Sequence, residues 1–143
     1  MKIMMLLLLI LTTSNVFAHG ENIPGPHGGH IRMPGAFHTE LVLSSQSAKV
    51  YLIDARFKNP ITENSKVDLT LHFKDKSEDI SCVKEQDHFT CPLPKKLTTI
   101  TGIDLKAVRN GVVGKVARYS LPLSFPQAQA PETSNNDHAH HNH

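Results

Sequence analysis

Histidine is the residue type in this chain that is best suited to chemistry, because a neutral imidazole nitrogen binds transition-metal ions. His38 and Glu40 lie two residues apart in a β-prone run, so on a strand their side chains project from the same face. Just upstream, His27 and His30 flank a pair of glycines, which would let the loop fold back toward that face. Imidazoles with a carboxylate suit copper(II), zinc, nickel or cobalt. We therefore predict a metal site of His27, His30, His38 and Glu40; the alternative is that they are ordinary polar surface residues beside a turn.

Two further groups of nitrogen ligands lie near the ends of the chain. If cleavage falls after Ala18, His19 becomes the first residue, and its amine and ring nitrogen can chelate one copper(II) ion; the alternative is a frayed arm that binds nothing. The C-terminal tract would capture divalent ions loosely, without a preformed cage. Its Ala and Asn interruptions favour a native tail over an engineered tag, and its histidines are His138, His140, His141 and His143.

The two cysteines, Cys82 and Cys91, are predicted to form a disulfide that staples a hairpin, because an exported chain enters an oxidising compartment. The alternative is a pair of soft thiolate ligands for copper(I) or zinc, which needs the compartment to keep them reduced. The sequence contains no nucleophile elbow, zinc-protease motif or phosphate-binding glycine loop, so we expect no enzymatic activity.

The N-terminus predicts export. Lys2 precedes an apolar run over residues 4–11, and Val16-Phe17-Ala18 presents small residues at the two positions that a signal peptidase recognises. The apolar run is about half the length of about twenty residues that a membrane-spanning helix needs. We therefore predict a signal peptide at 1–18, a periplasmic location and no stable membrane insertion after cleavage. Nearly balanced charge, without a basic block, argues against nucleic acid as a partner.

The rest of the chain shows the two-residue period of β-strands. Residues 66–74 alternate between apolar and polar side chains, and residues 117–125 repeat the pattern. Turn residues separate these from the other β-prone runs, and Asn110-Gly111 is a strong hairpin signal. About seven short strands predict an all-β fold, an antiparallel β-sandwich of immunoglobulin-like type, with a small barrel as the competitor. The further runs are 38–43, 48–57, 79–83, 88–91, 98–108 and 112–116.

Composition divides the chain into four parts. Residues 19–36 are rich in Gly, Pro and His and predict an extended or turning arm, whereas residues 37–125 hold the sandwich. Residues 126–143 have almost no apolar side chains and predict a disordered, His-rich tail after the domain. Residues 1–18 are the predicted signal peptide.

Three short motifs carry a family resemblance: His27-Gly28-Gly29, then residues 38–42 (HTELV), then residues 50–54 (VYLID). With these motifs the chain resembles the small metal-binding domain of heavy-metal efflux adaptor proteins of the copper and cobalt-zinc-cadmium type, and stand-alone exported relatives of that domain. The resemblance implies a β-sandwich that binds or senses a transition metal outside the inner membrane, with a heavy-metal efflux complex as partner. Its His-Gly-Gly and His-x-Glu positions correspond to His27, His38 and Glu40.

Together these observations predict a periplasmic protein that binds copper, or next zinc, nickel or cobalt, by reversible coordination and serves in metal tolerance, delivery or efflux. The alternative is a non-enzymatic interaction module of the cell envelope, whose His-rich tail binds metal only incidentally.

Overall fold

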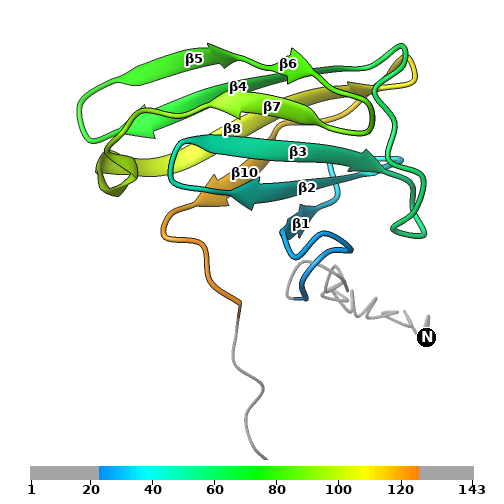
Figure 1. Cartoon of the computed structure of the whole chain (residues 1–143), viewed down its shortest axis with the longest axis horizontal. Helices are drawn as coiled ribbons and strands as arrows, with labels where there is room; N and C mark the ends of the chain where they lie inside the picture. The colour runs from blue at the N-terminus through cyan, green and yellow to red at the C-terminus, as the bar shows by residue number, and fades with distance from the viewer. Residues whose placement is uncertain (1–22, 126–143) are drawn as a thin grey trace, which may run out of the picture.

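The computed structural model describes residues 23–125, which form two antiparallel sheets packed face to face (Figure 1). The predicted signal peptide, His19 and the His-rich tail lie outside these residues. Apart from strands, turns and loops, residues 23–125 contain one short 3₁₀ turn. No helix in this part of the chain is long and apolar enough to span a bilayer.

The first sheet has the strand order β1-β2-β3-β7-β6. All its neighbouring strands pair antiparallel, and β2 and β3 form a hairpin in which Glu40 pairs with Tyr51 and His38 with Ile53. Its strands are β1 (His30–Arg32), β2 (His38–Leu43), β3 (Ser47–Ile53), β6 (Val83–Lys84) and β7 (Phe89–Pro92).

The second sheet has the order β10-β8-β4-β5, and a short strand β9 pairs with β8. The Asn110-Gly111 turn joins β8 to β9, as the sequence predicts, and both turn residues have positive φ. The 3₁₀ turn η1 (Leu97–Thr99) leads into β8. The strands are β4 (Lys66–Phe73), β5 (Ser77–Ser81), β8 (Ile100–Arg109), β9 (Val112–Val113) and β10 (Ala117–Ser120).

This topology confirms the immunoglobulin-like sandwich. The order β2-β3-β7-β6 corresponds to strands A-B-E-D of that fold, and β10-β8-β4-β5 corresponds to G-F-C-C′. Residues 23–125 contain ten strands rather than about seven. The chain adds short strands such as β1 at a sheet edge, and the run at 79–83 is divided at Cys82 between β5 and β6.

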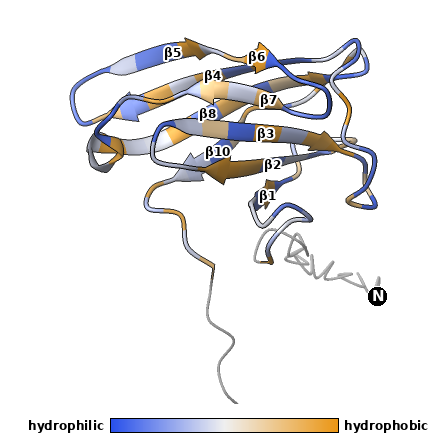
Figure 2. Cartoon of the chain, in the orientation of Figure 1, coloured by the Kyte–Doolittle hydropathy of each residue, from blue (hydrophilic) through white to orange (hydrophobic). Residues whose placement is uncertain are grey.

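The core lies between the sheets and follows from the alternation of the strands (Figure 2). In β4, Val67, Leu69 and Leu71 are buried, and the residues between them are only partly covered. One polar contact also joins the two sheets, where the hydroxyls of Thr39 in β2 and Tyr119 in β10 lie 2.8 Å apart. Their mutual hydrogen bond satisfies both groups in the core.

The disulfide prediction is confirmed: Cys82 and Cys91 are bonded to each other, and no free cysteine remains among residues 23–125. The β6–β7 register pairs Val83 with Thr90, so the two cysteines are adjacent across the strands. Cys91 is buried in the core, so the bond ties the edge of the first sheet to the interior. The thiolate alternative is contradicted, because neither sulfur is a free thiolate.

Several strand boundaries differ from the sequence prediction; the run at 117–125 is a strand only to Ser120, and the run at 112–116 only to Val113. Residues 30–32, assigned to an arm, form β1, because Ile31 is buried against Glu40 and its neighbours. The run at 48–57 ends at Ile53, because the carboxylate of Asp54 accepts backbone N–H groups of Arg56 and Lys58 and so makes a turn.

Candidate metal centre

The candidate site lies on the outer face of the first sheet. In β2 the odd-numbered side chains enter the core, so His38 and Glu40 face outward. Apolar side chains from β1, β2, β3 and the turn after β3 form a second, smaller cluster on this face. That cluster consists of Ile31, Tyr51 and Ile53, with Val42 and Phe57 packed against it.

Glu40 is the organising residue of this face. Its side chain is 0% exposed, and its Oε1 accepts hydrogen bonds from the backbone N–H groups of His27 and Gly29, at 2.8 and 2.9 Å. Its Oε2 lies 2.8 Å from Nδ1 of His27. A buried carboxylate is costly unless donors satisfy it, and here three donors do so. Glu40 therefore fixes the loop that carries His27, rather than offering a free oxygen to a ligand.

Two glycines allow the loop to approach Glu40 this closely. A Cβ at Gly25 would overlap the Glu40 carboxyl group, and a Cβ at Gly29 would lie 2.7 Å from the carbonyl oxygen of Leu41. Any side chain at either position would displace the loop. Of the glycine pair noted in the sequence, Gly29 therefore serves close packing, whereas Gly28, with a φ of +77°, serves the turn.

His27 is held in one orientation from two sides. A carboxylate only accepts hydrogen bonds, so Nδ1 of His27 carries the proton that it donates to Glu40. The ring stacks on Tyr51, with centroids 3.7 Å apart and planes at 3°. Within the described chain Nε2 has no hydrogen-bond partner, and the side chain is 30% exposed. The arrangement presents the Nε2 lone pair to the surface.

His38 is held in a similar way but lies deeper. Its Nδ1 lies 3.0 Å from the carbonyl oxygen of Asp54, which only accepts, and its ring stacks on Phe57 with centroids 4.4 Å apart. The residue is 5% exposed. Hydrogen bonds from the Lys58 and Arg56 backbones and from the Asn59 amide keep the pKa of Asp54 below its usual value, and the Lys58 bond has the largest effect. The same three hydrogen bonds hold the turn whose carbonyl oxygen contacts His38.

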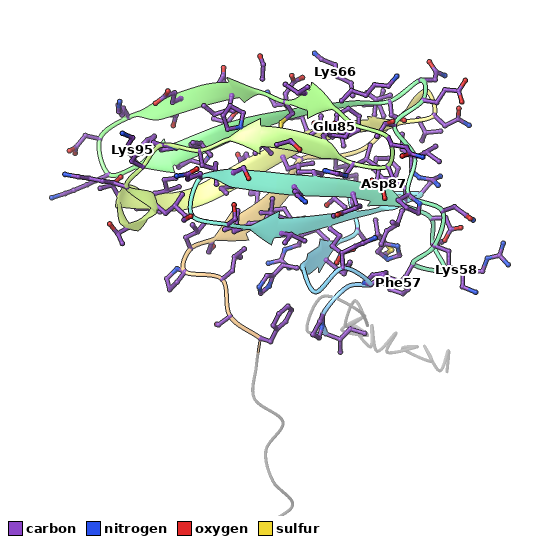
Figure 3. All side chains as sticks on the ribbon, viewed as in Figure 1. Phe57, Lys58, Lys66, Glu85, Asp87 and Lys95 are labelled. Carbon is purple, nitrogen blue, oxygen red and sulfur yellow. A yellow bond between two sulfur atoms is a disulfide. The ribbon has the colours of Figure 1, made fainter. Side chains whose placement is uncertain are left out.

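A third imidazole on this face was not selected by the sequence analysis. His88 immediately precedes β7, and its ring centroid lies 5.1 Å from that of Tyr51. Its Nδ1 lies 2.7 Å from Oδ1 of Asp87, and this hydrogen bond is the main reason that the pKa of Asp87 is lowered. Asp87 and Phe57 lie toward the same end of the sandwich (Figure 3). The amino-acid sequence carries no signal that places His88 beside Tyr51, because this placement depends on the pairing of β7 with β3.

His27, His38 and His88 share one arrangement: Nδ1 donates to an oxygen, and Nε2 faces away from that oxygen. Metal-binding histidines in proteins almost always have their second nitrogen held in this way, which fixes the tautomer and makes the ligating nitrogen more basic. Over residues 23–125, however, no three His, Cys, Asp or Glu side chains are already arranged to hold one ion. A complete coordination sphere would need ligands from outside these residues or from water.

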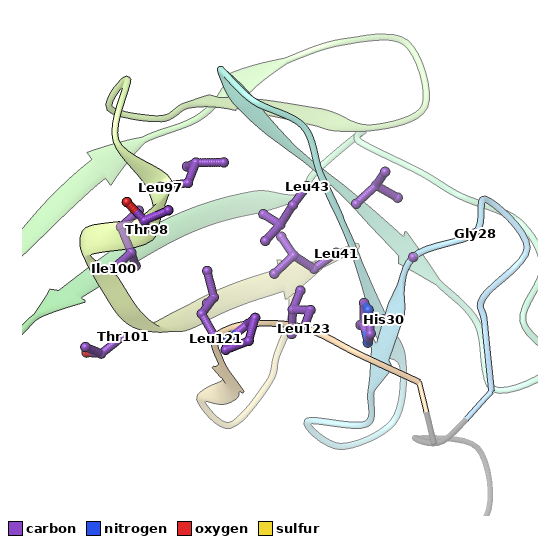
Figure 4. A pocket seen from close by; sticks show the side chains of 13 residues that line it. Gly28, His30, Leu41, Leu43, Leu97, Thr98, Ile100, Thr101, Leu121 and Leu123 are labelled. Atoms are coloured by element: carbon purple, nitrogen blue, oxygen red, sulfur yellow. The ribbon is translucent and has the colours of Figure 1, made fainter. Parts of the chain in front are cut away.

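The structure does not bring His30 to this face. His30 pairs with Leu41, whose side chain enters the core, so His30 projects from the inner side of the sheet. Its ring stacks on Phe125 with centroids 3.9 Å apart and borders an apolar hollow of about 660 Å³ between the sheets (Figure 4). Burial, and secondarily the charge of Arg32, lowers the pKa of His30. The sequence predicted that His27 and His30 share one face of the sheet, but His27 lies on its outer face and His30 on its inner face.

A comparison of the chain with known protein families, with curated proteins and with solved structures finds no match. The resemblance to efflux-adaptor domains therefore stays a prediction from short motifs.

Proposed function

We propose that this chain is an exported, periplasmic protein without enzymatic activity that binds a divalent transition metal, copper before zinc, nickel or cobalt. Its role would be metal tolerance, delivery or efflux. The observation that carries the proposal is the contact of His27 with the buried Glu40, at 2.8 Å. A buried carboxylate, an oriented imidazole and an exposed second nitrogen form the arrangement that supports a metal ligand.

The His27 loop is also rigid before any ion arrives. Glu40 holds two of its backbone N–H groups, and Tyr51 supports the ring. Preorganisation lowers the entropy lost on binding, because the ligand does not have to be ordered at that moment. This feature favours a defined site over loose capture by surface histidines.

The remaining ligands are proposed to come from the start of the processed chain. His19 is eight residues before His27. An extended segment of that length spans up to about 3.3–3.6 Å per residue, so the amine and ring of His19 are within reach of the outer face. The tail histidines would gather ions without forming a unique site.

The test uses the full chain, secreted with its own N-terminus so that processing occurs, and with the four tail histidines replaced by Ser. Copper(II) and zinc binding are measured by titration calorimetry for this protein and for His27→Ala. His72→Ala is the control, because His72 lies on β4 of the second sheet and its Nε2 already has an oxygen of Asp104 at 3.2 Å.

We expect one ion per chain, with affinity reduced at least tenfold in His27→Ala and unchanged in His72→Ala. Equal affinity in both variants would overturn the role of His27. Binding that is present only when the tail histidines are intact would reduce the protein to a metal sponge. Absence of binding in every form would leave the interaction-module alternative.

A further inference from the structure

We infer that His88 is a second metal ligand of this site, because His27 and His88 both contact Tyr51 and each is held through Nδ1 by a carboxylate. This inference rests on the proposed metal-binding function and adds a ligand with its own positioning carboxylate, Asp87.

The sheet register places His88 beside Tyr51. In the β3–β7 pairing Lys49 is opposite Thr90 and Val50 is opposite Phe89, so the next position along β3, Tyr51, lies beside His88. Phe89 is buried in the core, and alternation therefore turns His88 to the outer face. The ring contact with Tyr51, at 5.1 Å between centroids, agrees with this placement.

The two imidazoles are prepared in the same way. His27 is held by Glu40 and His88 by Asp87, each through Nδ1, so each ring has the tautomer with an unprotonated Nε2. Both rings also contact Tyr51, which restricts their rotation. Two histidines from loops far apart in sequence thus share one aromatic support.

The charge around Tyr51 favours a cation. Two carboxylates lie beside the proposed ligands: Glu40 is 2.8 Å from His27, and Asp87 is 2.7 Å from His88. Both negative charges therefore act on the space that the two imidazoles border. A bound dication would be attracted by this field, whereas an anion would be repelled.

His72 shows what a histidine in a purely structural hydrogen-bond network looks like in this protein. Its Nδ1 lies 2.9 Å from the Ser77 hydroxyl and its Nε2 lies 3.2 Å from an oxygen of Asp104. Both ring nitrogens therefore have an oxygen close by. His88 differs, because within residues 23–125 only its Nδ1 has such a partner.

Tyrosine fluorescence provides a local test. The chain has no tryptophan and two tyrosines, of which Tyr119 is buried in the core and Tyr51 lies at the site. Copper(II) sulfate is titrated into the full processed chain with its tail histidines replaced by Ser. We compare it with His88→Ala, Asp87→Asn and His27→Ala, with His72→Ala as control, and urea unfolding confirms that each variant is folded.

We expect copper(II) to quench the tyrosine emission with the same midpoint as binding measured by calorimetry. His88→Ala should weaken binding at least tenfold and Asp87→Asn by about 10- to 100-fold, because loss of a supporting carboxylate has effects of that size. In Tyr51→Phe the ion should still bind but the quenching should disappear.

The possible failures are distinguishable. If His27→Ala loses binding and folded His88→Ala binds as tightly as the parent, the role of His88 is overturned and the proposed function stands. Binding without quenching of Tyr51 places the ion elsewhere and also overturns the inference. If neither variant changes the affinity, or if no copper binds, the proposed function fails as well.

Discussion

Replacing Glu40 with Gln should separate the two roles of this residue, namely holding the loop and setting the tautomer of His27. Oε1 of the new amide can still accept the N–H groups of His27 and Gly29. The amide nitrogen then faces Nδ1 of His27 and donates to it. Nδ1 becomes an acceptor, so the proton moves to Nε2 and the nitrogen that would bind metal is blocked.

The expected cost in stability is small. A hydrogen bond to a charged group contributes about 1.5–3 kcal/mol and a neutral one about 0.5–1.5 kcal/mol, so three bonds are each weakened by about 1 kcal/mol. Removing the buried charge offsets part of that loss, because its desolvation costs several kcal/mol. We expect Glu40→Gln to lower the free energy of unfolding by about 1–2 kcal/mol. Glu40→Ala should cost about 3 kcal/mol or more, since it leaves buried donors unsatisfied.

Two measurements check this reasoning. Urea unfolding followed by circular dichroism gives the free energy of unfolding, and calorimetry with zinc and copper(II) gives the affinity. The affinity of Glu40→Gln should fall by about 10- to 100-fold although its fold is retained. Glu78→Gln is the control, because the Glu78 carboxylate is half-exposed and its ion pair with Lys76 is long, at 3.9 Å.

A Glu40→Gln protein that binds metal within threefold of the parent would refute the tautomer argument and with it the role of Glu40 in orienting His27. A fall in stability as large as that of Glu40→Ala would refute the assignment of Oε1 to the two backbone donors.

Three further predictions concern the sandwich and its other histidine. Tyr119→Phe leaves the Thr39 hydroxyl without its partner in the core and should cost about 1–3 kcal/mol in urea unfolding; no change would mean that the bond between the sheets contributes nothing. Reduction of the Cys82–Cys91 disulfide should lower the free energy of unfolding by about 2–3 kcal/mol, because the intact bond closes a short loop in the unfolded chain. The melting temperature with and without reductant measures this loss. Because burial lowers the pKa of His30, its NMR titration midpoint should lie below about 6.5, the free-histidine value. As the pH falls, the unfolded chain binds the proton of His30 before the folded chain does. The stability that neutral His30 contributes is therefore full above about pH 6.5 and is lost as the pH falls toward the pKa of the folded state. An NMR titration midpoint of His30 above 6.5 would contradict its burial.

The sequence predicted most of the fold because its signals are local. The alternation over residues 66–74 appears as β4, the Asn110-Gly111 turn joins β8 to β9, and the two cysteines are joined across adjacent strands. β1 escaped prediction, because a three-residue strand has too few positions to show a period. It exists because Ile31 finds a buried place against the outer face of β2.

The site was predictable only in part. The two-residue spacing put His38 and Glu40 on one face, and the structure has them there. The sequence could not show that Glu40 would be wholly enclosed and bonded to the His27 loop, since this depends on two glycines packing against it. Nor could it show that His30, three residues after His27, would turn to the core side of its strand.

What the sequence determined by itself was the two-residue period of the strands, the cysteine pair and the residue types able to bind metal, because each is a property of neighbours along the chain. Only the tertiary structure decided which histidines share a surface. His88 contacts Tyr51, as His27 does, because β7 pairs with β3, whereas His30 lies on the opposite face of the sheet. Alternation fixes the two faces of a strand, but the pairing of distant strands fixes which side chains meet there.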